Sequence, residues 1–132
     1  MRRQRLSTAW LLVAFITLPT RADNLALNAL LERHAMSNIA AITQQGNANQ
    51  VTLLQSGNAN ILLLLQQGEG NQLQAQQDGF NNSIELTQLG TNNLADITQR
   101  GAANQIELTQ LGNATFTVEQ LGNGAALSIT QY

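Results

Sequence analysis

The chain has 132 residues, enough for one domain, a formal net charge of −2 and no cysteine. The lack of cysteine excludes disulfides, zinc fingers, iron–sulfur ligation and thiol catalysis. A single histidine argues against a histidine metal cluster or a Ser–His–Asp triad. The chain has six basic residues, all Arg, and their only local cluster is at the extreme N-terminus, so a basic nucleic-acid footprint is absent. We therefore expect no catalytic residue, no metal site and no cofactor.

Residues 1–22 have the pattern of a secretory signal peptide. Three arginines in the first five residues precede an apolar stretch, residues 9–18, that is about half as long as a membrane-spanning helix requires. Thr20 and Ala22 are the small residues of a cleavage site, so we expect cleavage after Ala22 rather than retention as a membrane anchor. Cleavage leaves two arginines against eight acidic residues, a net charge of 2 − 8 = −6, which disfavours nucleic acid as a partner.

Residues 23–37 form a leader between the signal and the repeats. Within it, residues 25–36 are mostly apolar or Asn, with few charges. This pattern suits either a short amphipathic helix or a flexible tether. His34 has no neighbouring partner for catalysis and is interpreted as solvated.

From residue 38 onward the chain is a repeat. The pattern Gln-x-Gly-x-x-Asn recurs every eleven residues in six intact copies, the first over residues 44–49 and the last over residues 99–104. Two degenerate copies begin at Gln110 and Gln120, with one position deleted between them. A fixed period of this kind indicates a repeat architecture.

Three residue types occupy fixed positions of the repeat. The glutamines are Gln44, Gln55, Gln66, Gln77, Gln88, Gln99, Gln110, Gln120 and Gln131. The asparagines are Asn38, Asn49, Asn60, Asn71, Asn82, Asn93 and Asn104. The glycines, which we expect to form turns at positive φ, are Gly46, Gly57, Gly68, Gly79, Gly90, Gly101, Gly112 and Gly122.

The five residues between each Asn and the next Gln alternate in polarity. Ile84 and Leu86, for example, share the parity of the Asn and Gln that flank them, so all four side chains point to one face of a strand. Nine strands are therefore predicted, each but the last followed by a Gly-containing turn. They begin near Asn38, Asn49, Asn60, Asn71, Asn82, Asn93, Asn104, Thr115 and Ala125.

Two eleven-residue units make one coil of about 22 residues, and stacked coils place residue i under residue i+22 at a strand spacing of about 4.8 Å. We predict an all-β fold over residues 38–132, a β-solenoid that is a parallel in-register stack with two strands per coil. Stacked inward Gln and Asn side chains then satisfy one another's amides. A disordered Gln/Asn-rich tract is disfavoured, because such tracts keep no register with in-phase Leu and Ile.

The sequence shows no capping helix after the last predicted strand, which ends at Gln131 and Tyr132. An uncapped in-register stack is a template for another copy. We therefore expect self-assembly of the cross-β type.

With this repeat, these alternating strands and the secretory signal, the chain resembles the curlin repeat family over residues 38–131. These proteins are the subunits of curli, the functional amyloid on the surface of certain diderm bacteria. The resemblance implies export through a dedicated outer-membrane secretion channel with accessory factors. It also implies assembly with itself and with the major curlin subunit into biofilm matrix fibres. The leader without a Gly-rich segment and the aliphatic strands are more similar to the minor subunit, which nucleates the fibre.

Two alternative functions remain open at this point. One is the major fibre-forming curlin subunit; the other, of a different class, is a monomeric solenoid that binds ice or carbohydrate. Ile61, Leu63 and Leu65 face outward together and form either an interaction patch or a neutral surface. An enzyme is disfavoured, because the predicted outward faces carry no cluster of Asp, Arg, Lys or His.

Overall fold

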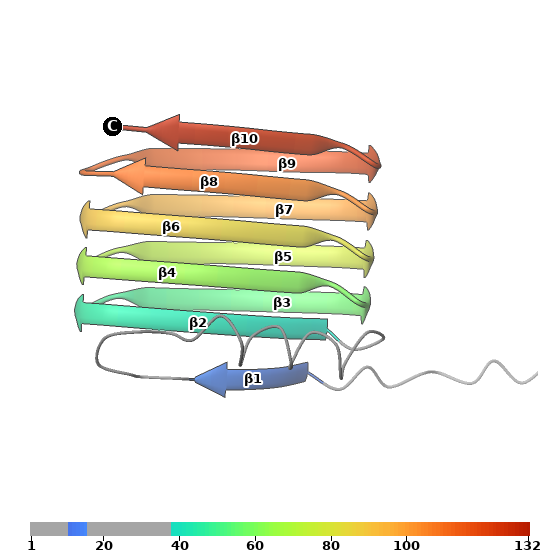
Figure 1. Cartoon of the computed structure of the whole chain (residues 1–132), viewed down its shortest axis with the longest axis horizontal. Coiled ribbons are helices and arrows are strands. Elements are labelled where there is room, and N and C mark those ends of the chain that lie inside the picture. The colour runs from blue at the N-terminus through green and yellow to red at the C-terminus, as the bar shows by residue number, and fades with distance from the viewer. Residues whose placement is uncertain (1–10, 16–37) are drawn as a thin grey trace, which may run out of the picture.

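The computed structural model describes residues 11–15 and 38–132, and the regular elements in these ranges are all strands (Figure 1). No helix within them is long and apolar enough to cross a membrane. The strands are β1 (Leu11–Phe15), β2 (Asn38–Asn47), β3 (Gln50–Asn58), β4 (Ile61–Glu69), β5 (Gln72–Phe80), β6 (Ser83–Thr91), β7 (Leu94–Ala102), β8 (Gln105–Leu111), β9 (Thr115–Asn123) and β10 (Ala126–Gln131).

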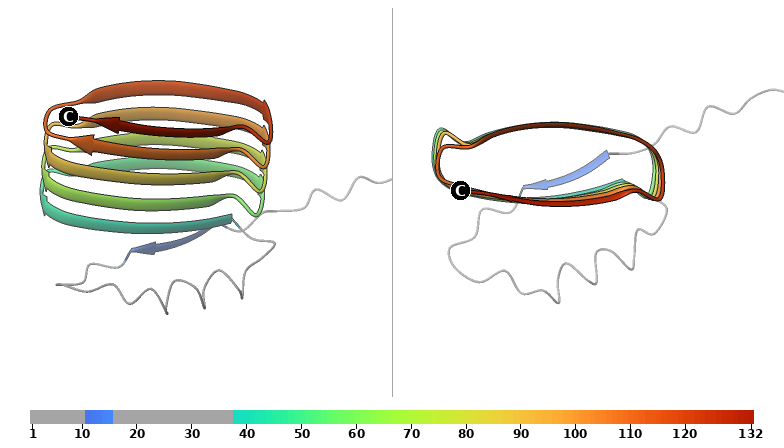
Figure 2. Two further views of the ribbon diagram at one scale, coloured as in Figure 1. Left: turned by 45° about the horizontal axis from the view of Figure 1, so that its top comes forward. Right: turned by 90° about the horizontal axis from the view of Figure 1, so that it is seen from above.

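Successive strands from β2 to β10 alternate between two facing sheets. One sheet has six strands in the order β1-β2-β4-β6-β8-β10, and the other has four in the order β3-β5-β7-β9. All pairs in the described residues are parallel. Viewed along the stack, the coils superimpose as one flattened loop whose long sides are the two sheets (Figure 2).

The register follows the repeat. Ile84 pairs with Leu62 on one side and with Ile106 on the other, an offset of 22 residues each time. After the deletion the offset falls to 21, so that Ile106 pairs with Leu127 and the side chains keep their phase. The predicted all-β solenoid with two strands per coil is therefore confirmed.

The strands extend further than the sequence predicts. Gly79, expected in a turn, lies inside β5 and pairs with Gly57 and Gly101 of the neighbouring coils. Its positive φ bends the chain while the backbone stays paired. The corner that remains between β5 and β6 is only two residues long, Asn81 and Asn82.

Strand β1 is an addition that the sequence does not predict. It pairs with the outer edge of β2, with Leu11 opposite Asn38 and Phe15 opposite Ile42. The apolar run of a signal peptide, rich here in Leu, Val and Phe, also suits an edge strand. Cleavage after Ala22 stays a prediction, and the leader at residues 23–37 lies outside the described residues.

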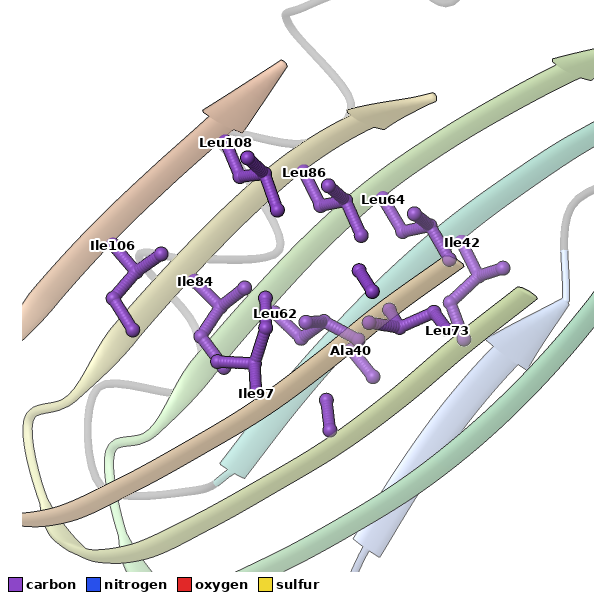
Figure 3. Close-up of a cluster of buried hydrophobic side chains, with 12 residues drawn as sticks. Ala40, Ile42, Leu62, Leu64, Leu73, Ile84, Leu86, Ile97, Ile106 and Leu108 are labelled. Carbon is purple, nitrogen blue, oxygen red and sulfur yellow. The ribbon is translucent and has the colours of Figure 1, made fainter. Parts of the chain in front are cut away.

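The core is a column of aliphatic side chains between the two sheets (Figure 3). Ile84, Ile97 and Ile106 in the middle of the stack are completely buried. On β3, β9 and β10, inward side chains are only partly buried because no further coil covers them. These are Val51, Leu53, Phe116, Val118, Leu127 and Ile129. The β10 end of the stack therefore presents an apolar strip flanked by the unpaired edges of β9 and β10. At the other end the edge of β3 is unpaired, and β1 pairs with the edge of β2.

Candidate functional site

The described residues hold no group of three or more His, Cys, Asp or Glu side chains that could bind a metal ion. Their polar side chains are organised instead along the stack. Inward Gln, inward Asn and corner Gly each form columns that link one coil to the next, and these columns are the candidate site.

The inward glutamines form two continuous ladders. In each, the Nε2 of one Gln donates to the Oε1 of the Gln one coil further on, as from Gln66 to Gln88 over 2.7 Å and from Gln77 to Gln99 over 3.0 Å. The interior members are completely buried. One ladder contains Gln44, Gln66, Gln88, Gln110 and Gln131. The other contains Gln55, Gln77, Gln99 and Gln120.

The Nε2 of each interior Gln also reaches the facing sheet. Gln88 Nε2 donates to the carbonyl of Gln72 over 3.0 Å, and Gln99 Nε2 donates to the carbonyl of Ser83 over 3.1 Å. An interior amide thus uses both donor hydrogens and its oxygen, as a buried amide requires. This network is the physical reason for Gln instead of Leu at this position.

The Gln ladders have a direction. Every Nε2 donates toward the β10 end of the stack, so the first oxygen of each ladder has no Gln beneath it. Gln55 Oε1 is buried and has no hydrogen-bond partner in the described part of the chain. At the other end, Gln131 receives a bond from Gln110 over 3.2 Å. The two ends of the stack are therefore chemically different.

The asparagine ladders run in the opposite direction. Asn82 Nδ2 donates to Asn60 Oδ1 over 3.0 Å, and the same oxygen accepts the backbone N–H of Asn82 over 3.1 Å. Asn93 bonds to Asn71 in the same way. Asn38, Asn60, Asn71, Asn82, Asn93 and Asn104 are buried, and Asn49 is half-buried.

Asparagine and glycine are linked in each corner. Asn60 Nδ2 donates to the carbonyl oxygen of Gly79, and Asn82 Nδ2 to that of Gly101, each over 3.0 Å. The glycines stack so closely that a Cβ at Gly79 would meet the Gly101 carbonyl oxygen. The corner glycines all have positive φ: Gly46, Gly57, Gly68, Gly79, Gly90, Gly101, Gly112 and Gly122.

A second left-handed position in the corner was missed by the sequence analysis. It is the residue directly before the ladder Asn, and its φ is +55° to +57° where it is not Gly. The available signal was that Gly or Asn, which tolerate this conformation, occupy it in three copies. The stack holds it in place, since the N–H of Ala103 donates to the Phe80 carbonyl over 3.0 Å. The residues concerned are Ala48, Ala59, Gly70, Asn81, Asn92 and Ala103.

The Asn ladders stop before the Gln ladders do. At the last two Asn positions the chain has Ala114 and Ala125, whose N–H groups donate to Asn93 and Asn104 over 3.1 and 3.2 Å. An alanine side chain offers no amide to a further coil. Toward the β10 end, therefore, only the Gln ladders extend to the last strands.

The patch of Ile61, Leu63 and Leu65 lies on the outer face of β4. Leu65 is exposed, and the other two are half-buried. Ile61 and Leu63 pair with Ile39 and Ala41 of β2, of which Ile39 is buried and Ala41 half-buried. On the other side, the facing positions of β6 are polar. The structure thus brings the three predicted residues together as an aliphatic surface on the outer face of β4.

An acidic column lies next to this surface. Glu85 and Glu107 are directly paired and exposed, and at a spacing of about 4.8 Å like charges oppose stacking by about 1 kcal/mol. We expect Glu107→Gln to shorten the lag of self-assembly several-fold at low salt, measured by thioflavin fluorescence.

A matched control for this column is Glu119→Gln. Glu119 is also exposed but pairs with Thr98, so its neutralisation removes no direct repulsion. The difference between the two variants should disappear at high ionic strength, where surface charges are screened. Equal lags for Glu107→Gln and Glu119→Gln at low salt would contradict the effect.

The repeat is also recognised by comparison with protein families. The model of the curlin associated repeat matches residues 79–112 and 90–132, from the end of β5 to β10. The similarity supports the curlin repeat family and, with the fold, a curli-type subunit, without separating minor from major subunits. No curated protein matches the chain.

Proposed function

We propose that this chain is a secreted curli amyloid subunit, and that it is the minor subunit, which nucleates fibre assembly on the cell surface in the biofilm matrix. The observation that carries the proposal is the stack itself. Its β10 end exposes the unpaired edges of β9 and β10, and its other end exposes the unpaired edge of β3, each with half-buried apolar side chains and the end of an amide ladder. Such an end binds a strand of the same repeat.

The nucleating role is supported by the aliphatic surface. Ile61, Leu63 and Leu65 add apolar area on the outer face of β4, apart from the core between the two sheets. A surface of this kind favours early association, because apolar contact needs no prior alignment of strands. The leader at residues 23–37, which resembles that of the minor subunit, adds to this support from the sequence.

The partners under this proposal are other copies of the chain, the major curlin subunit, and the outer-membrane curli secretion channel with its accessory factors. No catalytic group takes part. The inward Gln and Asn side chains and the corner glycines have a structural role: each aligns with the same residue of the next coil and so fixes the register of the added strand.

The test uses the chain as its host processes it, recovered from the cell surface in denaturant, with its N-terminus determined by mass spectrometry. Thioflavin fluorescence is followed after dilution, for the chain alone and for small seeds of it added to the host's major curlin. We expect fast self-assembly and loss of the partner's lag. Seeds heated in denaturant serve as the control and should leave the lag unchanged.

Other outcomes would identify the alternatives. Self-assembly without effect on the major curlin would contradict nucleation and indicate a major fibre subunit. A soluble β-rich monomer that forms no fibres would contradict both roles and leave a binding solenoid for ice or carbohydrate. An N-terminus other than Asp23 would overturn the predicted cleavage site.

A further inference from the structure

The β3 end of the stack carries a buried acceptor without a donor. Gln55 Nε2 is held by Ile39 O, Asn60 O and Gln77 Oε1 at 3.1, 3.3 and 2.8 Å, which fixes the amide. Its Oε1 has no hydrogen-bond partner among residues 11–15 and 38–132, although the side chain is only 8% exposed. An unpaired buried acceptor destabilises the folded state, because it has lost its hydrogen bond to water and gained no other. An amide donor beyond the edge of β3 would remove this cost.

The opposite end of the stack carries the matching donor. In the interior, the oxygen of each ladder Gln accepts from the Gln Nε2 one strand nearer the β3 end. Gln131 on β10 is the last member of its ladder, and its oxygen already accepts from Gln110. Its Nε2 is therefore the group that would reach the first Gln of a coil stacked on β10.

The order of the strands decides which sheets meet when two copies stack. Strands β2 and β10 belong to the same sheet, so the strand that continues the coil after β10 lies on β9, in the other sheet. A second copy continues the coil without a gap only when its β2 pairs with β9 and its β3 with β10. This requires a half-turn about the stack axis. Without the half-turn, β9 and the second copy's β3 would be two strand spacings apart, about 9.6 Å.

The side chains at the two ends fit the half-turn. When the Gln, Gly and apolar positions of the two copies are aligned as they are within one copy, Ala40 of the second copy would lie on Phe116. Phe116 has Ala95 on its other side. The large ring would then lie between two alanines, as close packing favours. At the same junction Gln55 of the second copy would lie over Gln131.

We propose that copies of this chain join end to end with a half-turn, the β9 and β10 edges of one copy pairing with the β2 and β3 edges of the next. In this junction Gln131 Nε2 donates to Gln55 Oε1 of the neighbouring copy. The junction rests on the proposed function of self-assembly. Because β1 pairs with the edge of β2 that the junction uses, it forms only in chains without β1, as expected after cleavage.

Cysteine cross-linking tests the junction, since the natural chain has no cysteine. The half-turn places Thr52 of one copy beside Ser128 of the next, at about 4.8 Å between strands, within reach of a disulfide. Host-processed Thr52→Cys and Ser128→Cys chains are mixed, assembled and mildly oxidised. Both residues are exposed, so neither change disturbs the core. In an equal mixture of random order, each chain has the complementary variant beside its cysteine half of the time, so we expect up to about half of the chains to become disulfide-linked dimers that reductant separates.

A second mixture tests stacking without the half-turn. There Ala41 of one copy would lie beside Ser128, so Ala41→Cys mixed with Ser128→Cys should give no dimers under the proposed junction. Dimers in this mixture, or fibres without dimers in the first, would overturn the junction and leave self-assembly intact. Failure of the unmodified chain to assemble would overturn both the junction and the proposed function.

Discussion

Gly79→Ala should strongly destabilise the stacking of the coils. A Cβ at this position meets the backbone carbonyl oxygen of Gly101, which cannot move without breaking the pairing of β5 with β7. The φ of +122° adds strain for any residue with a side chain. We expect a loss of about 2–5 kcal/mol in the free energy of unfolding, combining left-handed strain with overpacking. Denaturant unfolding of the freshly diluted chain, followed by circular dichroism, measures it.

Gly112→Ala is the matched control. Gly112 has a similar φ, +109°, but a Cβ there would have nothing within 4 Å. It therefore has the left-handed strain without the contact, and should lose only about 1–2 kcal/mol. If both variants were equally stable, stacking of the corner glycines would not be the source of the constraint.

Gln88→Met should break the amide ladder at its centre without changing the size of the side chain much. Gln88 accepts from Gln66 and donates to Gln110 and to the Gln72 carbonyl, and it is completely buried. Methionine fills the space but makes none of these three bonds. Gln110 Oε1 and the Gln72 carbonyl lose a donor, and Gln66 Nε2 loses an acceptor. At about 1–3 kcal/mol for each unsatisfied group, we expect a loss of at least about 3 kcal/mol and slow or absent assembly.

The control for the ladder is Gln74→Met, on the outward face of β5, the strand that precedes β6 in the chain and lies in the facing sheet. Gln74 is exposed, so the same chemical change leaves no buried group unpaired. Its unfolding midpoint and lag time should stay close to those of the unmodified chain. A Gln88→Met chain that behaved like Gln74→Met would show that the inward amides act only as space-filling groups.

The fold could be predicted from the sequence because the period of the residue pattern is also the period at which the strands stack. An eleven-residue period and alternation within each unit leave few architectures other than stacked strands, and Ile84 lies between Leu62 and Ile106 as the period requires. The deletion before Phe116 does not disturb this, because a shorter corner absorbs it: Gly112 is followed only by Asn113 before the next inward position.

Other features depend on three-dimensional detail that the pattern does not carry. Stacking alone does not fix the opposite directions of the Gln and Asn ladders, since a column of amides can point either way. The direction follows from the second bonds, such as Gln88 Nε2 to the facing Gln72 carbonyl and Asn82 Nδ2 to the Gly101 carbonyl. The left-handed Ala48 and Ala59 were missed because alanine itself gives no local signal for that conformation.

The central claim is that this chain keeps its solenoid when it assembles, so that one copy contributes several coils to the fibre. Mass per unit length of fibres of the host-processed chain, measured by scanning transmission electron microscopy, tests it directly. Nine strands in two sheets at a spacing of about 4.8 Å predict one chain per 22 Å or so of a single filament. A value near one chain per 4.8 Å, with each chain flat in its own layer, would contradict the claim.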